Sequence, residues 1–391
     1  MKVREIKPSV YYVGSRDPER KYFDQLIPLP AGTSYNSYLI KGSEKTALID
    51  TVYPPREHEI IEKLQQSNVE KLDYIIANHG EQDHSGSIAK LLELYPEAKV
   101  VTNVKCKEII MDLYPIADEK FIVIADGETL SLGDKTLEFI IAPWVHWPDT
   151  MFTYVREDNI IFTCDFFGSH ISDENLYVED EDAVLEAAKR YYAEIMMPFA
   201  KIFRKYIDKV EALNPDIIAT SHGPIYANPK LILDAYKEWS SPEVNKDVVV
   251  VRISMYGSTD KMVDHVVEKL LAAGISVKQH EALEADLGEL AMDLVNASGL
   301  IVAAPTVLSG PHPNVVSLLY LANALKPELK FASILGSYSW GGMMAQTIKG
   351  LLGNLRTTEF LEPVMVKGHP KEADFARLDA LAEEIIAKNN A

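Results

Sequence analysis

Seven side chains of the kinds that bind metals stand at strand ends in the first half of this sequence. Four of them lie in one loop, ANHGEQDHSGS (residues 77–87), which places two imidazoles and two carboxylates within six positions. The candidate ligands are His79, Glu81, Asp83, His84, His146, Asp165 and His222. A set of this size fits none of the usual one-metal arrangements, so it predicts a site for two metal ions.

Two metals sharing these ligands need one bridging carboxylate. Asp165 is the expected bridge, because it stands alone between two loops that carry histidines. The expected division gives one metal His79, Glu81, His146 and Asp165, and gives the other Asp83, His84, Asp165 and His222. Zinc tolerates such a set, but a glutamate where a third histidine could stand adds a hard oxygen donor. Carboxylate-rich sites with open positions favour redox-active iron.

The elements that must position these residues are short strands with helices between them. Each predicted strand is rich in β-branched residues, and most end in a polar residue or a turn. The predicted strands are Thr46–Thr51, Asp73–His79, Lys99–Asn103, Thr136–Pro143, Asn159–Asp165 and Asp216–Gly223. Residues 182–213 read as helical from their three- and four-residue apolar spacing, and Pro198 should interrupt or kink that helix.

The pattern changes at the polar segment Ser240–Asp247, which we interpret as a linker between residues 1–245 and 246–391. Beyond it, strands alternate with helices, and one helix ends at Gly274, a favourable C-cap. The predicted strands are Val248–Ser254, Gly299–Thr306, Phe331–Ser337 and Leu361–Gly368. Continuous apolar strands alternating with helices predict a doubly wound parallel sheet.

Three loops follow strands of that sheet, where ligands of such folds bind. The loop 254–262 has hydroxyls and leads into a helix, which suits a phosphate, but it matches neither a Walker loop nor GxGxxG. The loops 304–313 and 336–344 could flank a planar ring. Together the three resemble the FMN site of a flavodoxin. The candidate flavin contacts are Ser254, Met255, Tyr256, Gly257, Ser258, Thr259, Pro305, Thr306, Val307, Leu308, Ser309, Gly310, Ser337, Tyr338, Ser339, Trp340, Gly341 and Gly342.

Composition excludes several classes of protein. The formal net charge of −19 argues against nucleic acid as a partner. No apolar run reaches the length of a membrane span, and the N-terminus has no apolar signal core, so a cytoplasmic location is expected. The two cysteines, Cys106 and Cys164, are expected to be small buried hydrophobes. Two thiolates are too few for a rubredoxin-type centre.

The motif H-x-E-x-D-H, followed by His146, Asp165 and His222 and then by a flavodoxin-like half, resembles the flavodiiron proteins (A-type flavoproteins). The hydrolytic relatives of that family carry H-x-H-x-D-H. The resemblance covers essentially the whole chain, including LIPLPAGTSYNSYLI (residues 26–40). It implies a metallo-β-lactamase-like αββα sandwich followed by a flavodoxin domain.

The family resemblance also implies an activity: reduction of dioxygen to water or of nitric oxide to nitrous oxide. It implies FMN, two non-haem irons and a head-to-tail homodimer, which can pair into a dimer of dimers. Electrons would come from a separate rubredoxin or from reduced coenzyme F420. Carried over, the iron ligands are the seven residues named above, with His84 as a variable ligand. His170 would support the ligands, or be a surface histidine.

Other interpretations of single residues and of the whole remain open. Trp147 could shield the metal pocket or be an ordinary packed aromatic, and a lone histidine such as His369 is usually a satisfied core or surface residue. The alternatives to a flavodiiron oxidoreductase are a dizinc hydrolase with an accessory flavodoxin-like domain and an electron carrier with a vestigial metal site. The sequence does not choose between O₂ and NO.

Overall fold

The computed structural model describes residues 2–390, which form two compact units. The first contains the described residues up to Tyr192 together with Phe199–Glu238, and the second contains Ala193–Pro198 together with the described residues from Trp239 onward. Between α7 (Pro229–Trp239) and β17 (Val248–Arg252) the chain forms no helix or strand, as expected of a linker. The division of the chain at residue 245 stays a prediction.

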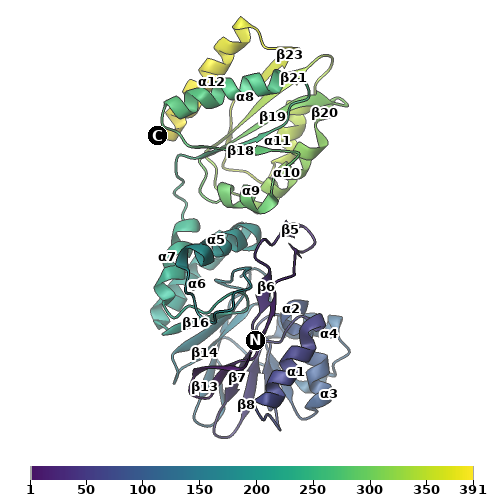
Figure 1. The fold of residues 1–391 in the computed structure, drawn as a ribbon, viewed down its shortest axis with the longest axis vertical. Coiled ribbons are helices and arrows are strands. Elements are labelled where there is room, and N and C mark those ends of the chain that lie inside the picture. Colours follow the sequence, from purple (N-terminus) through teal and green to yellow (C-terminus); the bar gives the residue numbers. More distant parts are fainter. Residues whose placement is uncertain (1, 391) are drawn as a thin grey trace. The chain divides into compact units, whose positions relative to one another are not determined.

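The first unit contains two large sheets (Figure 1). In spatial order, the seven-stranded sheet contains β1 (Arg4–Lys7), β2 (Val10–Tyr12), β7 (Tyr38–Lys41), β8 (Thr46–Ile49), β9 (Tyr74–Ile76), β10 (Lys99–Thr102) and β11 (Phe121–Val123). The five-stranded sheet contains β12 (Thr129–Ser131), β13 (Thr136–Ile141), β14 (Met151–Val155), β15 (Ile160–Cys164) and β16 (Ile217–Thr220). Two small ribbons join β3 (Ser15–Asp17) to β6 (Thr33–Tyr35) and β4 (Tyr22–Phe23) to β5 (Ile27–Pro28).

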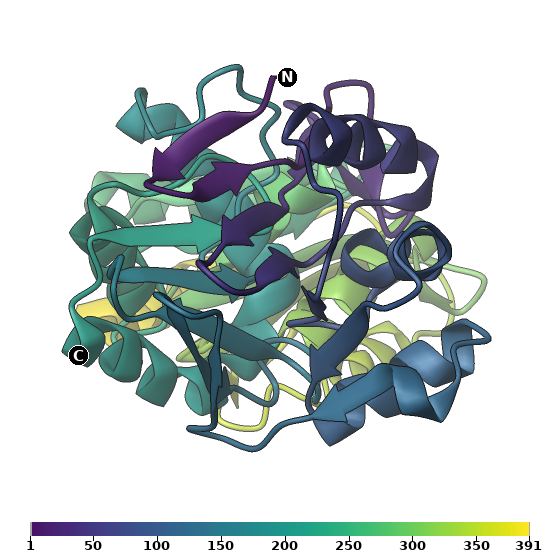
Figure 2. The same ribbon diagram turned by 90° about the horizontal axis from the view of Figure 1, so that it is seen from below.

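Alternation of side chains along the strands decides which layer each residue joins. In β8, Ala47 and Ile49 belong to the core between the sheets, whereas Leu48 points the other way, into the core under the helices. Those helices are α1 (Glu57–Gln66), α3 (Ile88–Leu94) and α4 (Val104–Leu113). On the opposite side α5 (Glu181–Tyr191), α6 (Ala200–Leu213) and α7 lie over the second sheet (Figures 1 and 2). The unit is the expected αββα sandwich.

The predicted long helix is interrupted where proline was expected to interrupt it. After α5 the chain makes a π-helical turn, Tyr192–Met196, and a 3₁₀ turn, Met197–Phe199, before α6 begins. Pro198 lacks the N–H that a continuous α-helix would need at that position.

The second unit is a parallel sheet with helices on both faces. In spatial order its main strands are β18 (Val277–Glu281), β17, β19 (Gly299–Val307), β21 (Phe331–Tyr338) and β22 (Glu359–Phe360). Two further strands lie off this order: β23 (Val364–Lys367) pairs with β21, and the short β20 (Gly310–Pro311) pairs with β19. One face packs on α9 (Leu287–Leu294), α10 (Pro313–Leu325) and α11 (Met344–Leu351), the other on α8 (Ser258–Ala272) and α12 (Glu372–Asn390). The doubly wound prediction is confirmed.

Four strands were predicted in this half, and the edge strand β18 was missed. Its sequence, VKQHE, has no apolar run, and only His280 is buried. An edge strand pairs on one side only and needs little apolar surface, so the pattern that marks the central strands is absent from it.

Gly299 allows β19 and β21 to pack closely, because a Cβ there would lie 2.2 Å from the ring of the buried Phe331. We expect Gly299→Ala to lower the free energy of unfolding of the second unit by about 1–3 kcal/mol, the usual cost of overpacking. The control is Gly350→Ala: Gly350 lies in helix α11, and the new methyl group would have no atom within 4 Å. That variant should gain up to about 1 kcal/mol. Denaturant unfolding measures both, and equal shifts in the two variants would contradict the prediction.

Candidate metal centre

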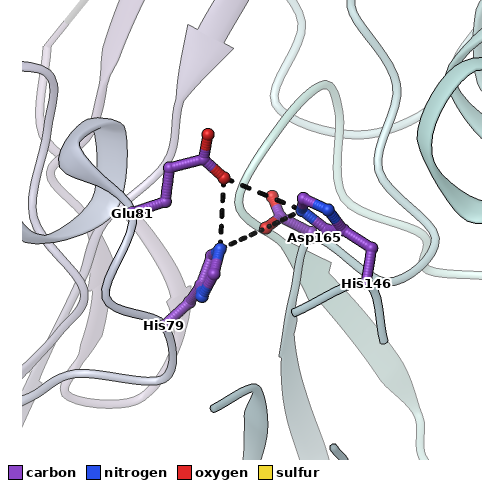
Figure 3. A group of neighbouring side chains, drawn as sticks. All are labelled: His79, Glu81, His146 and Asp165. Atoms are coloured by element: carbon purple, nitrogen blue, oxygen red, sulfur yellow. Dashed lines mark hydrogen bonds and ion pairs between the residues drawn. The ribbon is translucent and has the colours of Figure 1, made fainter. Parts of the chain in front are cut away.

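The structure brings all seven predicted ligands together from the ends of β9, β13, β15 and β16. Three groups of side chains lie close enough to hold a metal ion: His79 with Glu81, His146 and Asp165; Asp83 with His84 and His222; and His84 with Cys164 and Asp165. The first group, drawn in Figure 3, approaches from two sides, with Glu81 and His79 from one loop and His146 and Asp165 from two others.

Asp165 stands between two sets of imidazoles. Its Oδ2 lies 3.3 Å from His146 Nε2 and 3.6 Å from His79 Nε2 (Figure 3). Its Oδ1 lies 3.0 Å from His84 Nε2 and 3.3 Å from His222 Nε2. Each carboxylate oxygen therefore faces a different group, which is the geometry that the predicted bridge requires.

The remaining carboxylates complete one group each. Glu81 Oε2 lies 3.2 Å from His79 Nε2. Asp83 has one oxygen 3.3 Å from His84 Nε2 and the other 3.3 Å from His222 Nε2. The geometry thus has the same division into two sets that the sequence predicted, with His84 in the second set.

Several of these inward-facing nitrogen and oxygen atoms lie close together without forming hydrogen bonds to one another. Both ring nitrogens of His84 and Oδ1 of Asp83 are buried and have no hydrogen-bond partner within residues 2–390. Nε2 of His84 still lies at ion-pair distance from Asp165 and Asp83, so the cost of about 1–3 kcal/mol for an unpaired buried group falls on Nδ1 of His84. Cations between the two sets would satisfy the inward-facing atoms and offset the repulsion among three carboxylates, so the donor set fits a pair of metal ions.

Contacts behind the ligands set which nitrogen of each ring faces inward. Nδ1 of His79 lies 3.1 Å from Oδ2 of Asp149, which also accepts a hydrogen bond of 2.7 Å from the Gly80 N–H. Nδ1 of His222 donates to the carbonyl of Ser34 at 2.6 Å. Both arrangements leave Nε2 free to bind a metal.

Sequence reasoning missed Asp149 and Tyr191. Asp149 is fully buried and contacts His79, 70 positions earlier in the chain. No local sequence pattern predicts a contact between residues so far apart. The Tyr191 hydroxyl donates to Oδ1 of Asp165 at 2.9 Å, and burial raises the pKa of that hydroxyl well above its usual range. Tyr191 thus remains a proton-bearing donor that orients the Asp165 carboxylate.

The buried carboxylates and imidazoles of the cluster shift one another's pKa values in opposite directions. Burial alone would raise the pKa of Asp165, but the neighbouring imidazoles of His84, His146 and His222 hold it well below its usual range. Burial would lower the pKa of His222, but Asp165 and Asp83 outweigh it and raise that pKa to about 10. Because a metal binds the neutral imidazole, metal binding would compete with the proton that this raised pKa favours on His222.

His170 and Trp147 both lie beside the ligands. His170 is 5% exposed, so the surface interpretation is wrong; its Nδ1 lies 2.9 Å from the Thr33 hydroxyl. Burial and the neighbouring His222 hold the pKa of His170 well below its usual range. The Trp147 ring meets His79 edge-on, with centroids 4.9 Å apart. Both line a cavity of about 330 Å³ whose wall also includes Glu81 and Asp83.

Both cysteines are buried, as expected. Cys164 lies near His84 and Asp165, but burial raises the pKa of its thiol well above the usual range. Since a thiol binds metal as the thiolate, Cys164 is a poor ligand here.

A second pocket, of about 250 Å³, opens at the carboxyl ends of the strands in the second unit. Ten of the predicted flavin contacts line it: Ser254, Met255, Tyr256, Ser258, Thr259, Pro305, Thr306, Ser337, Tyr338 and Ser339. The other eight do not: Gly257, Val307, Leu308, Ser309, Gly310, Trp340, Gly341 and Gly342.

Two residues that the sequence did not single out for this pocket, Gly368 and His369, complete its wall. His369 is exposed, as expected of a surface histidine, and lies at the edge of this pocket. The Thr306 hydroxyl is buried with no partner in the described chain, and Gly257 adopts φ +79° with open space beside it. An unpaired hydroxyl and an open backbone loop fit a polar ligand such as a flavin.

Within residues 2–390, no helix is both long enough and apolar enough to cross a bilayer.

Comparisons with known proteins agree with this architecture. A family model described as "ODP family beta lactamase" matches residues 33–223. The chain is 34% identical to the nitric oxide reductase of Moorella thermoacetica, over 98% of both chains. Two solved structures superpose over the whole chain: rubredoxin oxygen:oxidoreductase from Desulfovibrio gigas (TM-score 0.94, 27% identity, 100% of that chain) and the flavodiiron protein from Giardia intestinalis (TM-score 0.90, 26% identity, 97% of that chain).

Asp149→Asn tests whether the contact behind His79 supports metal binding. The amide keeps the size of the side chain but removes the charge and one acceptor from two buried donors. We expect metal affinity to fall by about 10- to 100-fold, as is usual for loss of such a contact. Asp112→Asn, an exposed position with the same change of charge, is the control. Metal content after dialysis against a graded chelator measures both, and equal retention of metal would refute the role.

Proposed function

The chain belongs to the flavodiiron protein family, and we propose that it reduces dioxygen to water, nitric oxide to nitrous oxide, or both. The observation that carries the proposal is the bridging position of Asp165 between two complete ligand sets, one of which contains Glu81. A flavodoxin-like second unit in the same chain supports redox chemistry over hydrolysis.

The proposed metal ions are two non-haem irons. His79, Glu81 and His146 would hold one, Asp83, His84 and His222 the other, and Asp165 would bridge them. Nε2 of His84 lies 3.0 Å from Oδ1 of Asp165 without forming a hydrogen bond to it, which favours this histidine as a ligand. When bound, the iron pair supplies electrons and open coordination positions to the substrate, and FMN supplies the electrons to the iron pair.

The chain's own residues prepare that site. Asp149 and Tyr191 hold ligands in orientation, and Trp147, Phe23, Leu29 and Leu113 make part of the cavity wall apolar. An apolar wall admits a small uncharged molecule and limits the water around it. His170 faces the same cavity as a neutral imidazole that holds its position through Thr33.

FMN is the proposed occupant of the second pocket. Ser258 and Thr259 begin the helix α8, where backbone N–H groups favour an anion such as a phosphate. Tyr338 and the segment Pro305–Thr306 line the part of the pocket where the ring would lie.

The electron donor is proposed to be a separate molecule, because this sequence has two cysteines where a rubredoxin centre needs four thiolates. A rubredoxin-type protein fits the name of the D. gigas relative. Reduced coenzyme F420 is the other donor that the family resemblance implies.

A head-to-tail homodimer is proposed from exposed apolar side chains in each unit. Around the flavin loops, Tyr256 is 90% and Leu308 is 92% exposed, and Met255, Trp340 and Met343 are also exposed. In the first unit, Tyr22, Leu26 and Leu113 are exposed on or beside segments that line the metal-site cavity. Exposed apolar groups of this kind mark interaction surfaces, and we propose that each surface packs on the other subunit.

The activity is tested by reducing the iron-loaded, flavin-loaded protein anaerobically and mixing it with O₂ or NO. We expect flavin reoxidation much faster than that of free FMN. The control His146→Ala, which removes one ligand, should reoxidise at the rate of free FMN. The proposal is wrong if the wild-type flavin reoxidises no faster than free FMN. It is also wrong if the protein binds two zinc ions and hydrolyses esters or lactams. Parallel assays with rubredoxin and with reduced F420 identify the donor.

The dimer is tested with Leu308→Glu, which would place an unpaired charge in the proposed interface. We expect this variant to become monomeric in light scattering and to lose O₂- or NO-driven flavin oxidation, while still accepting electrons into its flavin. Leu271→Glu, on α8 and 55% exposed, is the matched control and should stay dimeric. A fully dimeric Leu308→Glu protein would contradict the proposed surface.

A further inference from the structure

Arg20 is a cationic side chain in the wall of the metal-site cavity of the first unit. Within residues 2–390, no other lysine or arginine lines this cavity of about 330 Å³. Nε of Arg20 donates to the carbonyl of Tyr22 at 2.9 Å, and Cζ of Arg20 lies 5.1 Å from the centroid of the Tyr53 ring. These two contacts hold the guanidinium beside the cavity.

The charge of Arg20 is not neutralised by a neighbouring acid. Within residues 2–390, no carboxylate forms an ion pair with it, and Asp17, three positions earlier, pairs with Arg56 at 2.6 Å. Asp24 also lines the cavity, again without pairing with Arg20. A guanidinium has five N–H donors, and the contact with the backbone uses one of them. Arg20 therefore has donors left for a ligand in the cavity.

A buried imidazole offers a second donor to the same cavity. His170, which lines the cavity, is 5% exposed, and its Nε2 has no hydrogen-bond partner within residues 2–390. The Thr33 hydroxyl lies 2.9 Å from Nδ1 of His170 and 3.4 Å from the Ser34 carbonyl, so we assign the hydroxyl proton to the nearer acceptor. The ring proton of His170 is then on Nε2, as an unused N–H donor.

The charge of the metal-loaded cavity also favours an anion. The three ligand carboxylates Glu81, Asp83 and Asp165 offset all but one of the positive charges of two divalent ions. Arg20 and Asp24 add one positive and one negative charge to the wall. One positive charge therefore remains without a counterion in a partly buried site, where a small anion would neutralise it.

We propose that this cavity binds a small planar oxyanion, of the class of nitrite and formate, between Arg20 and His170. The guanidinium donates to one oxygen of the anion, and the Nε2–H of His170 donates to another. The anion occupies the space that the proposed function gives to O₂ or NO, and so competes with them. The inference rests on the proposed function for the metal pair, whose remaining charge the anion offsets.

The test measures anion binding rather than turnover. Oxidised full-length protein loaded with iron and FMN is titrated with nitrite, formate and chloride by calorimetry at constant ionic strength. We expect Arg20→Met and His170→Phe each to weaken nitrite and formate binding about tenfold, the effect of losing one hydrogen bond to a charged group. Chloride should bind more weakly than either oxyanion, because a single atom cannot place separate acceptors at the two donors.

Lys21→Met is the matched control: it removes the adjacent positive charge at an exposed position that does not line the cavity. Iron content is measured in every variant. Arg20 is not among the proposed metal ligands, so Arg20→Met remains a valid test even if His170→Phe loses iron.

The inference is overturned if either test variant, with its iron retained, binds nitrite as tightly as the wild type. It is also overturned if Lys21→Met loses as much affinity as Arg20→Met, since the effect would then be general electrostatics. A loaded wild-type protein that reduces O₂ or NO but binds neither oxyanion overturns the inference alone. A protein that takes up no pair of metal ions overturns the proposed function, so the two failures are distinguishable.

Discussion

The buried Asp165 carboxylate is the group on which the arrangement of the metal centre depends. One oxygen faces His79 and His146, and the other faces His84 and His222. A buried charge is tolerated only when it is paired, and here the imidazoles hold the pKa of the carboxylate well below its usual range. Loops from four strand ends must therefore converge on a single side chain.

Strand pairing and a few buried hydrogen bonds produce that convergence. β15 and β16 run parallel, so Asp165 and His222 emerge at the same edge of one sheet. The β9 loop, from the other sheet, is held by the Asp50 carboxylate, which accepts from the backbone and the side chain of Asn78. Asn78 in turn accepts from Thr153 in the second sheet. These bonds tie the two sheets together directly behind the metal ligands.

The two units use opposite electrostatics. The first gathers carboxylates and imidazoles around a candidate metal site, and the second borders its pocket with hydroxyls and the N-terminus of α8. A dizinc hydrolase could use the first arrangement, but Glu81 makes the donor set richer in oxygen, which favours iron. An electron carrier with a vestigial metal site would not need every ligand, the bridge and the contacts behind them to be present together.

The sequence by itself determined the central strands, the doubly wound second half and the candidate metal ligands, because apolar runs and polar strand ends are local patterns; the αββα arrangement of the first half was implied by the family resemblance. Only the tertiary structure revealed Asp149 behind His79, Tyr191 on Asp165 and His369 at the second-unit pocket. It also corrected His170 from a possible surface residue to a buried one. Each of these contacts joins residues tens to more than a hundred positions apart, and such pairs are set by how strands and helices pack rather than by any spacing along the chain.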